Sequence, residues 1–376
     1  MISWLLPAAL LIVAAWAALR FLPAGTEARG VLPYLIALTP FSWIPAAAIA
    51  VWTLAAQQWW VACVGFALTA LIAAIERQTY HNTAVSPATA NAENTTAIQV
   101  MTLNCRYGRA SAQAIVQMVR REHIQVLALQ ELSEDLVGRL NDAGLRETLA
   151  YCSIGTPTND DNGGFNGVWS QLKPTQTSSS SVAIPGAEVP CLTIAIGGNS
   201  TMQNASVTTL TVGGYEDQQN RHTSQASTIR FFSAHPKSPM RGTRQWSAGV
   251  IGLARLLSDA PNPAMPDAHA ARHDASDIGQ KAKATVIMGD LNSHIDHPSF
   301  RRLLRAGFQD ANRQAPNGSV ASFPRFLPWP RIELDHILTA PANIISATGA
   351  HAEQIPGSDH LALTATVHVQ SAPFTQ

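Results

Sequence analysis

The 376-residue sequence has few charged residues and very little lysine. Asp, Glu, Lys and Arg together make up 13% of the chain, about half the share of an ordinary soluble domain. Lysine occurs at only four positions, and the formal net charge is zero. A basic protein that coats nucleic acid and a protein with an acidic disordered tail are therefore both disfavoured.

The shortage of charge is greatest at the N-terminus. Among the first 75 residues only Arg20, Glu27 and Arg29 are charged, which leaves 47 of the 50 charged residues for the other 301 positions. Residues 2–19 are uncharged, and so are the 45 residues 31–75, which are enough for two spans of about 20 residues. The sequence predicts a membrane anchor of three transmembrane helices over 1–77, with two helices as the alternative.

The break between the second and third spans is expected at 53–60, where two glutamines and two tryptophans suit an interfacial turn. Pro33, Pro40 and Pro45 fall in the second expected span, where a helix bundle or water must satisfy the carbonyl groups that proline leaves unpaired.

A permanent anchor is favoured over a cleaved signal peptide, because a signal peptide begins with basic residues and this chain has none before Arg20. The orientation signal is weak. Arg20 and Arg29 would hold the first loop inside the cell, and with it the C-terminal domain, but Glu27 offsets part of their charge.

A polar stretch over 78–96, rich in Thr, Asn, Ala and Ser, predicts a linker. A domain follows over 97–370, in which apolar runs of strand length alternate with helical patterns. The runs lie at 98–103, 124–129, 228–233, 284–288 and 361–369, and the helical patterns follow Arg109 and cover 246–257. This alternation predicts an α/β domain.

Several polar segments of the domain are expected to be surface loops. They lie at 156–161, 175–181, 199–227 and 259–280. The four cysteines give little information about disulfide bonds. Cys63 falls in an expected span, and Cys105 directly follows an expected strand. Cys152 and Cys191 are a candidate disulfide if the domain lies outside the cytoplasm, with two unpaired buried thiols as the alternative.

Polar side chains recur at the ends of the expected strands. These ends are Leu-Asn at 103–104, Leu-Gln-Glu at 129–131, Ser-Ala-His-Pro at 233–236, Gly-Asp-Leu-Asn at 289–292, Leu-Asp-His at 334–336 and Ser-Asp-His at 358–360. Each one alone is more often a helix cap or a turn. Together they place amide, carboxylate and imidazole groups where the loops of an α/β sheet carry functional side chains.

The six motifs, taken together and in this order along the chain, make the sequence resemble the endonuclease/exonuclease/phosphatase superfamily over about 98–369. The resemblance implies a four-layer α/β sandwich of the deoxyribonuclease type, and the anchor is similar to that of bacterial membrane-bound members. It also implies that Glu131 binds a metal ion and that Asn104 and Asp359 help to hold the ion or the phosphate. Such oxygen ligands suit Mg²⁺, or Mn²⁺ in its place.

The same resemblance implies in-line attack of water on phosphorus, without a covalent intermediate. Asp290 would orient or deprotonate the water, and Asn292 would donate to a phosphoryl oxygen. His360 would be a base or a phosphate clamp, with Asp335 accepting from its ring, and His235 would bind a non-bridging oxygen. Asp290 and Asn292 are two residues apart, so on an extended segment both would point to one side.

Other polar residues near these motifs are expected to be structural. His336 alternates to the opposite face of its strand from Asp335, and Trp246 is expected to pack. Asp296 is expected to cap the helix through 300–304, although with His294 and His297 it could extend the site. Ser170 is not expected to be catalytic.

The sequence therefore predicts a membrane-anchored, metal-dependent phosphoesterase that prefers phosphodiesters. The family resemblance outweighs the loop charges and implies that the catalytic domain lies outside the cytoplasm. Its substrate would be a nucleic acid or a phospholipid or inositol head group, and no obligate protein partner is evident. The absence of a basic stripe disfavours tight duplex binding. The alternatives are an inactive binding module on the same fold and a phosphomonoesterase for lipid or sugar phosphates. A transporter is disfavoured, because the spans carry no charged residue of the kind that marks a pathway.

Overall fold

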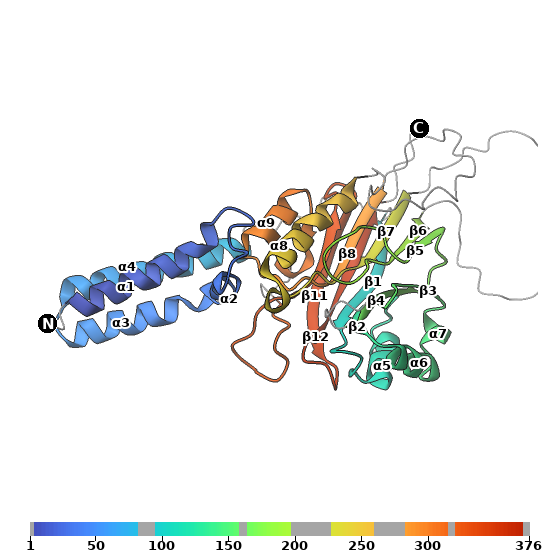
Figure 1. Ribbon diagram of the computed structural model, residues 1–376, viewed down its shortest axis with the longest axis horizontal. Coiled ribbons are helices and arrows are strands. Elements are labelled where there is room, and N and C mark those ends of the chain that lie inside the picture. The colour runs from blue at the N-terminus through green and yellow to red at the C-terminus, as the bar shows by residue number, and fades with distance from the viewer. Residues whose placement is uncertain are drawn as a thin grey trace, which may run out of the picture.

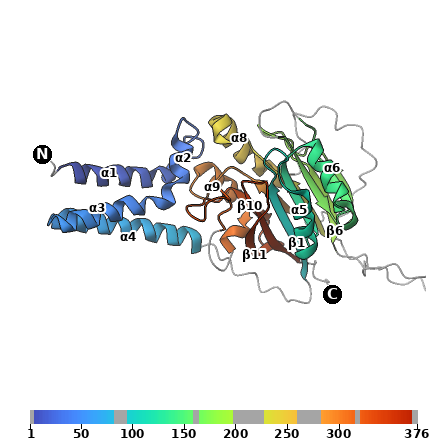
Figure 2. The same ribbon diagram turned by 90° about the horizontal axis from the view of Figure 1, so that it is seen from below.

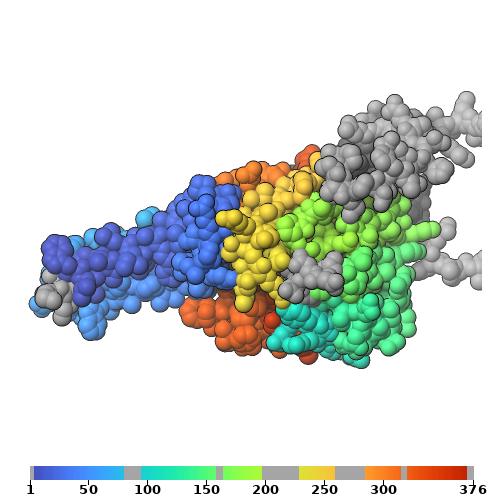
Figure 3. Space-filling model, viewed as in Figure 1, coloured from blue at the N-terminus to red at the C-terminus, as the bar shows by residue number. Residues whose placement is uncertain are grey.

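The computed structural model describes residues 4–81, 95–157, 164–196, 227–258, 283–314 and 320–370. These residues form an N-terminal helical part and an α/β domain, and the helical part projects from one end of the domain (Figures 1 and 3). The helical part contains α1 Leu5–Ala18, η2 Leu19–Phe21, α2 Leu32–Ala37, η3 Thr39–Phe41, α3 Trp43–Ala55 and α4 Trp59–His81.

One helix in the described part of the chain is long and apolar enough to cross a bilayer, over Trp59–Thr79 in α4. Two shorter apolar helices accompany it, Leu5–Phe21 and Thr39–Ala55. The turn between α3 and α4 lies at 56–58, inside the expected break. The expectation that the second span is one continuous helix is wrong. Pro33 and Pro40 stand in the first turns of separate short helices, where a missing N–H costs nothing.

The long helices pack through small residues and a few apolar side chains. Val13, Ala46 and Ile72 form their buried cluster, and a Cβ added at Gly65 would lie 2.8 Å from the Cβ of Ala50. Most of their large apolar side chains instead point outward; Leu11, Ile12, Val51, Trp52, Trp59, Trp60, Val64 and Leu71 are all more than half exposed.

The described residues of the α/β domain form two six-stranded sheets. The first has the order β11-β12-β1-β2-β4-β3, which are Ile345–Gln354, Leu361–Gln370, Thr95–Asn104, Val126–Leu132, Phe165–Ser170 and Tyr151–Ile154. The second has the order β5-β6-β7-β8-β10-β9, which are Gln176–Ser178, Cys191–Ile196, Ser227–Ser233, Lys283–Asp290, Asp335–Ala340 and Gln309–Asp310.

The two sheets pack face to face, and helices cover their outer faces (Figure 2). Val100 and Val126 of the first sheet share a buried cluster with Phe231 and Val286 of the second. A second cluster joins the first sheet to α5 Ala112–Arg121, α6 Glu134–Asp142 and α7 Leu145–Thr148. A third joins the second sheet to α8 Thr243–Gly252 and α9 Pro298–Arg305. The predicted four-layer α/β arrangement is confirmed.

The strand directions bring the polar motifs together at one end of the two sheets. β1 and β2 run parallel, with Asn104 beside Gln130, and so do β7 and β8. β10 begins where β8 ends, because Asp335 pairs with Asp290, and the start of β12 lies beside the end of β1. The sheet order thus gathers segments that are far apart in the sequence.

Some expectations about local structure are wrong. The expected loop at 175–181 contains strand β5, which pairs with β6. For Cys152 and Cys191 the alternative of two unpaired thiols is confirmed; they lie in strands of different sheets, with Cys191 buried and Cys152 partly buried. In the expected linker, α4 continues to residue 81 and β1 begins at 95, while 82–94 lie outside the described residues. Most of the expected loops at 199–227 and 259–280 also lie outside them.

The helical part is joined to the α/β domain by buried polar contacts. Asp296 is not the cap of α9, whose N-cap position is His297. Instead, Asp296 is fully buried, forms an ion pair with Arg20 and accepts a hydrogen bond from Thr39 Oγ1 at 2.9 Å. Glu27 accepts from the backbone N–H of Ser299 at 2.6 Å, at the beginning of α9. The segment after α1 therefore satisfies the first turn of α9 in place of a local side chain.

A candidate active site where the strands end

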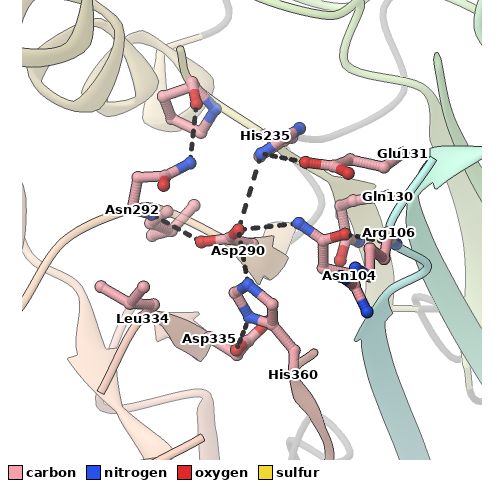
Figure 4. Close-up of polar contacts among 12 residues, drawn as sticks. Asn104, Arg106, Gln130, Glu131, His235, Asp290, Asn292, Leu334, Asp335 and His360 are labelled. Carbon is pink, nitrogen blue, oxygen red and sulfur yellow. Dashed lines mark hydrogen bonds and ion pairs between the residues drawn. The ribbon is translucent and has the colours of Figure 1, made fainter. Parts of the chain in front are cut away.

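Asp290 lies at the centre of a buried polar cluster (Figure 4). Its Oδ2 accepts from Asn104 Nδ2 at 2.9 Å, and it lies 3.6 Å from His235 Nε2 and 3.7 Å from His360 Nε2. Burial by itself raises the pKa of Asp290, but the charges of His360 and His235 and the bond from Asn104 outweigh burial and hold the pKa well below its usual value. Asp290 is thus an ionised carboxylate between two imidazole rings.

A glycine brings His235 to this carboxylate. A Cβ at Gly289 would lie 1.9 Å from the carbonyl oxygen of Ala234, so only glycine lets the end of β8 approach the segment after β7 so closely. His235 Nε2 also lies 3.8 Å from Glu131 Oε1. Burial lowers the pKa of His235, but the neighbouring Asp290 and Glu131 carboxylates raise it above its usual value.

His360 forms the hydrogen-bonded pair with Asp335 that the family resemblance implies. Its Nδ1 lies 2.7 Å from Asp335 Oδ2, and the Phe323 ring packs 4.8 Å from the imidazole. Burial lowers the pKa of His360, but the Asp335 and Asp290 carboxylates outweigh burial and raise the pKa to about 10. His360 is therefore an imidazolium at neutral pH, with Nε2 directed toward Asp290.

Asn104 and Glu131 come from the first sheet. The amide of Asn104 accepts from Arg106 N–H at 2.8 Å while it donates to Asp290. Glu131 has a φ of 52°, uncommon for a non-glycine residue, and its Oε2 accepts from Tyr107 N–H at 3.0 Å. Burial raises the pKa of Glu131. The unusual backbone turns this carboxylate from its strand toward His235 (Figure 4).

The donor set fits a hard divalent cation. Glu131 and Asp290 are carboxylates that both lie within 4 Å of His235 Nε2, and Asn104 offers an amide oxygen beside them; Mg²⁺ and Mn²⁺ prefer such ligands. Asp335 Oδ1 is a buried oxygen without a hydrogen-bond partner. One atom from each of Asp290, Asp335 and His360 lies within 4.8 Å of the others. Asp335 Oδ2 and His360 Nδ1 are already hydrogen-bonded to each other.

Asp359 is the expected site residue that lies apart from the cluster. Its Oδ2 is 3.6 Å from Arg106 Nε, and its side chain is 30% exposed. Arg106 links it to Asn104, because Arg106 N–H donates to that amide.

Asn292 is placed by a turn, so the expected extended segment from Asp290 to Asn292 is wrong. Asn292 has a φ of 48°, and its backbone N–H donates to Asp290 Oδ1 at 2.8 Å. Its Nδ2 donates to the carbonyl of Pro236 at 3.2 Å, which fixes the amide beside the loop that follows His235. Trp246, buried as expected, also donates from Nε1 to the carbonyl of Asn292 at 2.9 Å.

Two residues of the strand-end motifs to which the sequence analysis gave no role, Gln130 and Ser358, connect the site. Gln130 Nε2 donates to Ser233 Oγ at 2.9 Å and thereby joins the two sheets. Ser358 Oγ donates to the carbonyl of Asn104 at 2.7 Å and accepts from His360 N–H at 2.9 Å. Both residues stand one or two positions from an expected site residue. That proximity was the available signal, but the partners Ser233 and Asn104 lie more than 100 positions away.

Neighbouring histidines are structural. His336 bonds with Asp310 at 2.8 Å and with the Ser293 carbonyl at 2.9 Å, as its position on the opposite face predicted. His297 Nε2 lies 2.8 Å from the carbonyl of Pro33. Burial lowers the pKa of His294 to about 3 and that of His297 to about 4, so both rings are neutral at physiological pH. Ser170 Oγ accepts from Leu172 N–H at 2.9 Å in a local turn.

A family model described as "Endonuclease/Exonuclease/phosphatase family" matches residues 101–360. No curated protein matches the chain. Among solved structures, the chain is similar to a family protein from Leptotrichia buccalis C-1013-b, with 14% identity, a TM-score of 0.46, and coverage of 71% of this chain and 98% of the other.

Two further structures show similarity at the same level. One is D. rerio TDP2 complexed with single strand DNA product, with 13% identity, a TM-score of 0.48, and coverage of 72% of this chain and 99% of the other. The other is a mutant of beta toxin from Staphylococcus aureus with bound magnesium ions, with 11% identity, a TM-score of 0.47, and coverage of 72% and 99%. At such low identity and similarity, the assignment depends on the family match and on the arrangement of the site.

Proposed function

The chain belongs to the endonuclease/exonuclease/phosphatase family of phosphoester hydrolases, and from this we propose that it is a divalent-metal-dependent phosphodiesterase anchored in a membrane. One observation carries the proposal. Asp290, an ionised carboxylate, lies within 4 Å of two histidines and accepts from Asn104. A module that only binds has no need for such a cluster, because burying the titratable side chains of His235, Asp290, Asp335 and His360 in one place is costly to fold.

Each residue of the cluster has a role that follows from its protonation state. Asp290 has a lowered pKa, so it stays ionised and can accept a hydrogen bond that orients the attacking water. His360, held by Asp335, would carry a proton at Nε2 and act as a phosphate clamp rather than a base; its raised pKa supports this choice. His235 and the second N–H of the Asn292 amide donate to phosphoryl oxygens.

Glu131 and Asn104 would hold the divalent ion, with Asp359 as a more distant contributor through Arg106. The ion, when bound, supplies positive charge that stabilises the negative charge developing on the phosphoryl oxygens. The burial that raises the pKa of Glu131 makes a bound cation favourable, because neutralising a buried carboxylate offsets its desolvation.

The experiment is hydrolysis of bis-p-nitrophenyl phosphate by the full-length protein in detergent with Mg²⁺. Replacing the central carboxylate, Asp290→Asn, should lower kcat about 10²- to 10⁴-fold. The matched control is Asp142→Asn, the same change at an exposed position at the end of α6. Near-normal turnover by a folded Asp290→Asn protein would refute the proposal.

A phospholipid head group is a second candidate substrate, and the loop before Asp335 favours it. Phe326 and Trp329 are 71% and 61% exposed, and the Trp329 ring lies 5.6 Å from the ring of Phe41, the last residue of η3. Phe323 of the same loop packs its ring against the imidazole of His360. Comparing sphingomyelin, inositol phosphates, RNA and single- and double-stranded DNA at equal phosphodiester concentration would decide between the candidates.

The membrane proposal rests on the helical part. Helix α4 has the length and composition of a span, and its neighbours α1 and α3 expose a band of large apolar side chains that lipid would cover. We infer a three-helix anchor in the cell membrane and a catalytic domain outside the cytoplasm. Protease added to intact cells should remove the domain; a domain that resists until the cells are lysed would place it inside.

A further inference from the structure

A pocket lined by four arginines lies where the helical part meets the α/β domain. It measures about 480 Å³ and is lined by Arg20, Arg301, Arg305 and Arg313 together with apolar side chains that include Phe21 and Ile75. No acidic side chain is among the residues that line it. Its size lies in the range of sites for small ligands.

The arginines of this pocket differ in the groups that hold them. Arg20 pairs with Asp296 and with Glu76. Arg301 donates instead to backbone carbonyls, those of Ile295 at 3.1 Å, Asp296 and Arg20. A carbonyl oxygen orients a guanidinium group but does not cancel its charge.

Arg305 and Arg313 add to this positive field. Arg313 donates to the carbonyl of Thr79, and Arg305 is exposed at the end of α9. Burial is the main cause that lowers the pKa of Arg301. The carboxylates of Asp296 and Glu27 raise it, and the like charges of Arg20 and Arg305 lower it. Repulsion among these groups would be relieved by an anion, and guanidinium groups match phosphate geometry particularly well.

The position of the pocket indicates the source of that phosphate. Arg20 lies in η2, which directly follows α1, and Thr79 lies in the last turns of α4, so the pocket is at the domain end of both helices. Figures 1 and 2 show α9 beside this end of the helical part. If these helices span a bilayer, the arginines lie at head-group level, and Phe21 and Ile75 face the acyl region next to them.

We propose that this pocket binds the phosphate group of an anionic phospholipid from the surrounding bilayer, which would fix the α/β domain at the membrane surface. The proposal rests on the membrane anchoring inferred above. The site is separate from the catalytic cluster, since none of its lining residues belongs to that cluster.

The test uses the full-length protein in lipid nanodiscs with chelator present, so that no lipid is hydrolysed. Native mass spectrometry would count lipids retained after transfer to detergent, comparing phosphatidylglycerol with phosphatidylcholine. The wild type should retain phosphatidylglycerol selectively, and Arg305→Gln should weaken that retention at least about tenfold, as expected for loss of a charged hydrogen bond. The matched control is Arg302→Gln, an exposed arginine of α9 that does not line the pocket.

Three results would overturn the proposal. They are equal retention of both lipids, equal loss in the Arg302→Gln and Arg305→Gln proteins, and full displacement of the lipid by inorganic phosphate at equal concentration. Failure of the anchoring proposal would look different, because the wild-type protein would then not float with vesicles of phosphatidylcholine alone.

Discussion

Asn104 and Asp290 are 186 positions apart, yet Asn104 Nδ2 donates to Asp290 Oδ2 at 2.9 Å. Asn104 ends β1 in the first sheet, and Asp290 ends β8 in the second. This hydrogen bond therefore crosses the interface between the two sheets, and the candidate site exists only when the sheets are packed together.

Replacing Asn104 should impair catalysis in two distinguishable ways. Asn104→Ala removes a hydrogen bond to a charged group, which is worth about 1.5 to 3 kcal/mol, so kcat/KM should fall roughly 10- to 100-fold. Asn104→Asp should do more, because a second carboxylate beside Asp290 raises the pKa of Asp290. The acidic limb of the rate profile should then move to higher pH, and an unchanged limb would contradict the assignment of Asp290.

Metal removal should abolish activity, and added Mg²⁺ or Mn²⁺ should restore it. Glu131→Gln removes one negative oxygen from the expected ligand set, so the Mg²⁺ concentration for half-maximal recovery should rise at least about tenfold. Glu134→Gln changes an exposed glutamate three positions later and should leave that concentration unchanged. Full activity of the wild type in excess chelator would remove the metal from the mechanism.

The pair of His336 and Asp310 should make stability depend on pH. Burial lowers the pKa of His336, but Asp310, 2.8 Å away, raises it to about 9, against roughly 6.5 in the unfolded chain. The folded state therefore binds this proton more tightly than the unfolded chain does. The contribution of the pair to the free energy of unfolding is full below about pH 6.5, falls as pH rises, and is lost above about pH 9. The difference between the folded and unfolded pKa of His336 corresponds to about 3 kcal/mol of folding free energy.

The measurement is chemical unfolding in detergent across this pH range, for wild type and Asp310→Asn. The difference in free energy of unfolding between them should be greatest below about pH 6.5, should shrink between about pH 6.5 and pH 9, and should be small above about pH 9. A difference that stays constant with pH would show that the pair acts through packing alone.

The ion pair between Arg20 and Asp296 should couple the anchor to the domain. Arg20→Met leaves Asp296 buried without its partner, which should lower the free energy of unfolding by about 3 to 5 kcal/mol. Asp296→Asn in the same chain should recover part of the loss, since the buried charge is then absent. A double-mutant cycle gives the coupling, and additive losses would mean that the two side chains do not interact.

The same contacts have a practical consequence for assays. A fragment that begins near residue 81 lacks Arg20, Glu27 and Thr39, which satisfy Asp296 and the first turn of α9. We expect this fragment to be less stable and less active than the full chain on bis-p-nitrophenyl phosphate. Equal melting temperature and kcat for both proteins would contradict this expectation.

The sequence by itself determined the class of the protein and most of its site. Uncharged stretches and strand-length apolar runs depend on local composition, so they predicted an apolar N-terminal part and an α/β domain. Polar residues at strand ends are visible in the same way, because a strand that is buried over its length must become polar where it leaves the sheet. His235, Asp290, Asp335 and His360 were found by this signal.

Only the tertiary structure decided how these groups are used. The turn at Asn292 and the left-handed backbone of Glu131 depend on partners in other segments. The protonation of His360 follows from carboxylates 25 and 70 positions away. Asp296 looked like a local cap, but its partners Arg20 and Thr39 come from the other end of the chain. Buried polar groups must be satisfied by whatever the fold brings within 3 Å, and sequence spacing does not reveal those neighbours.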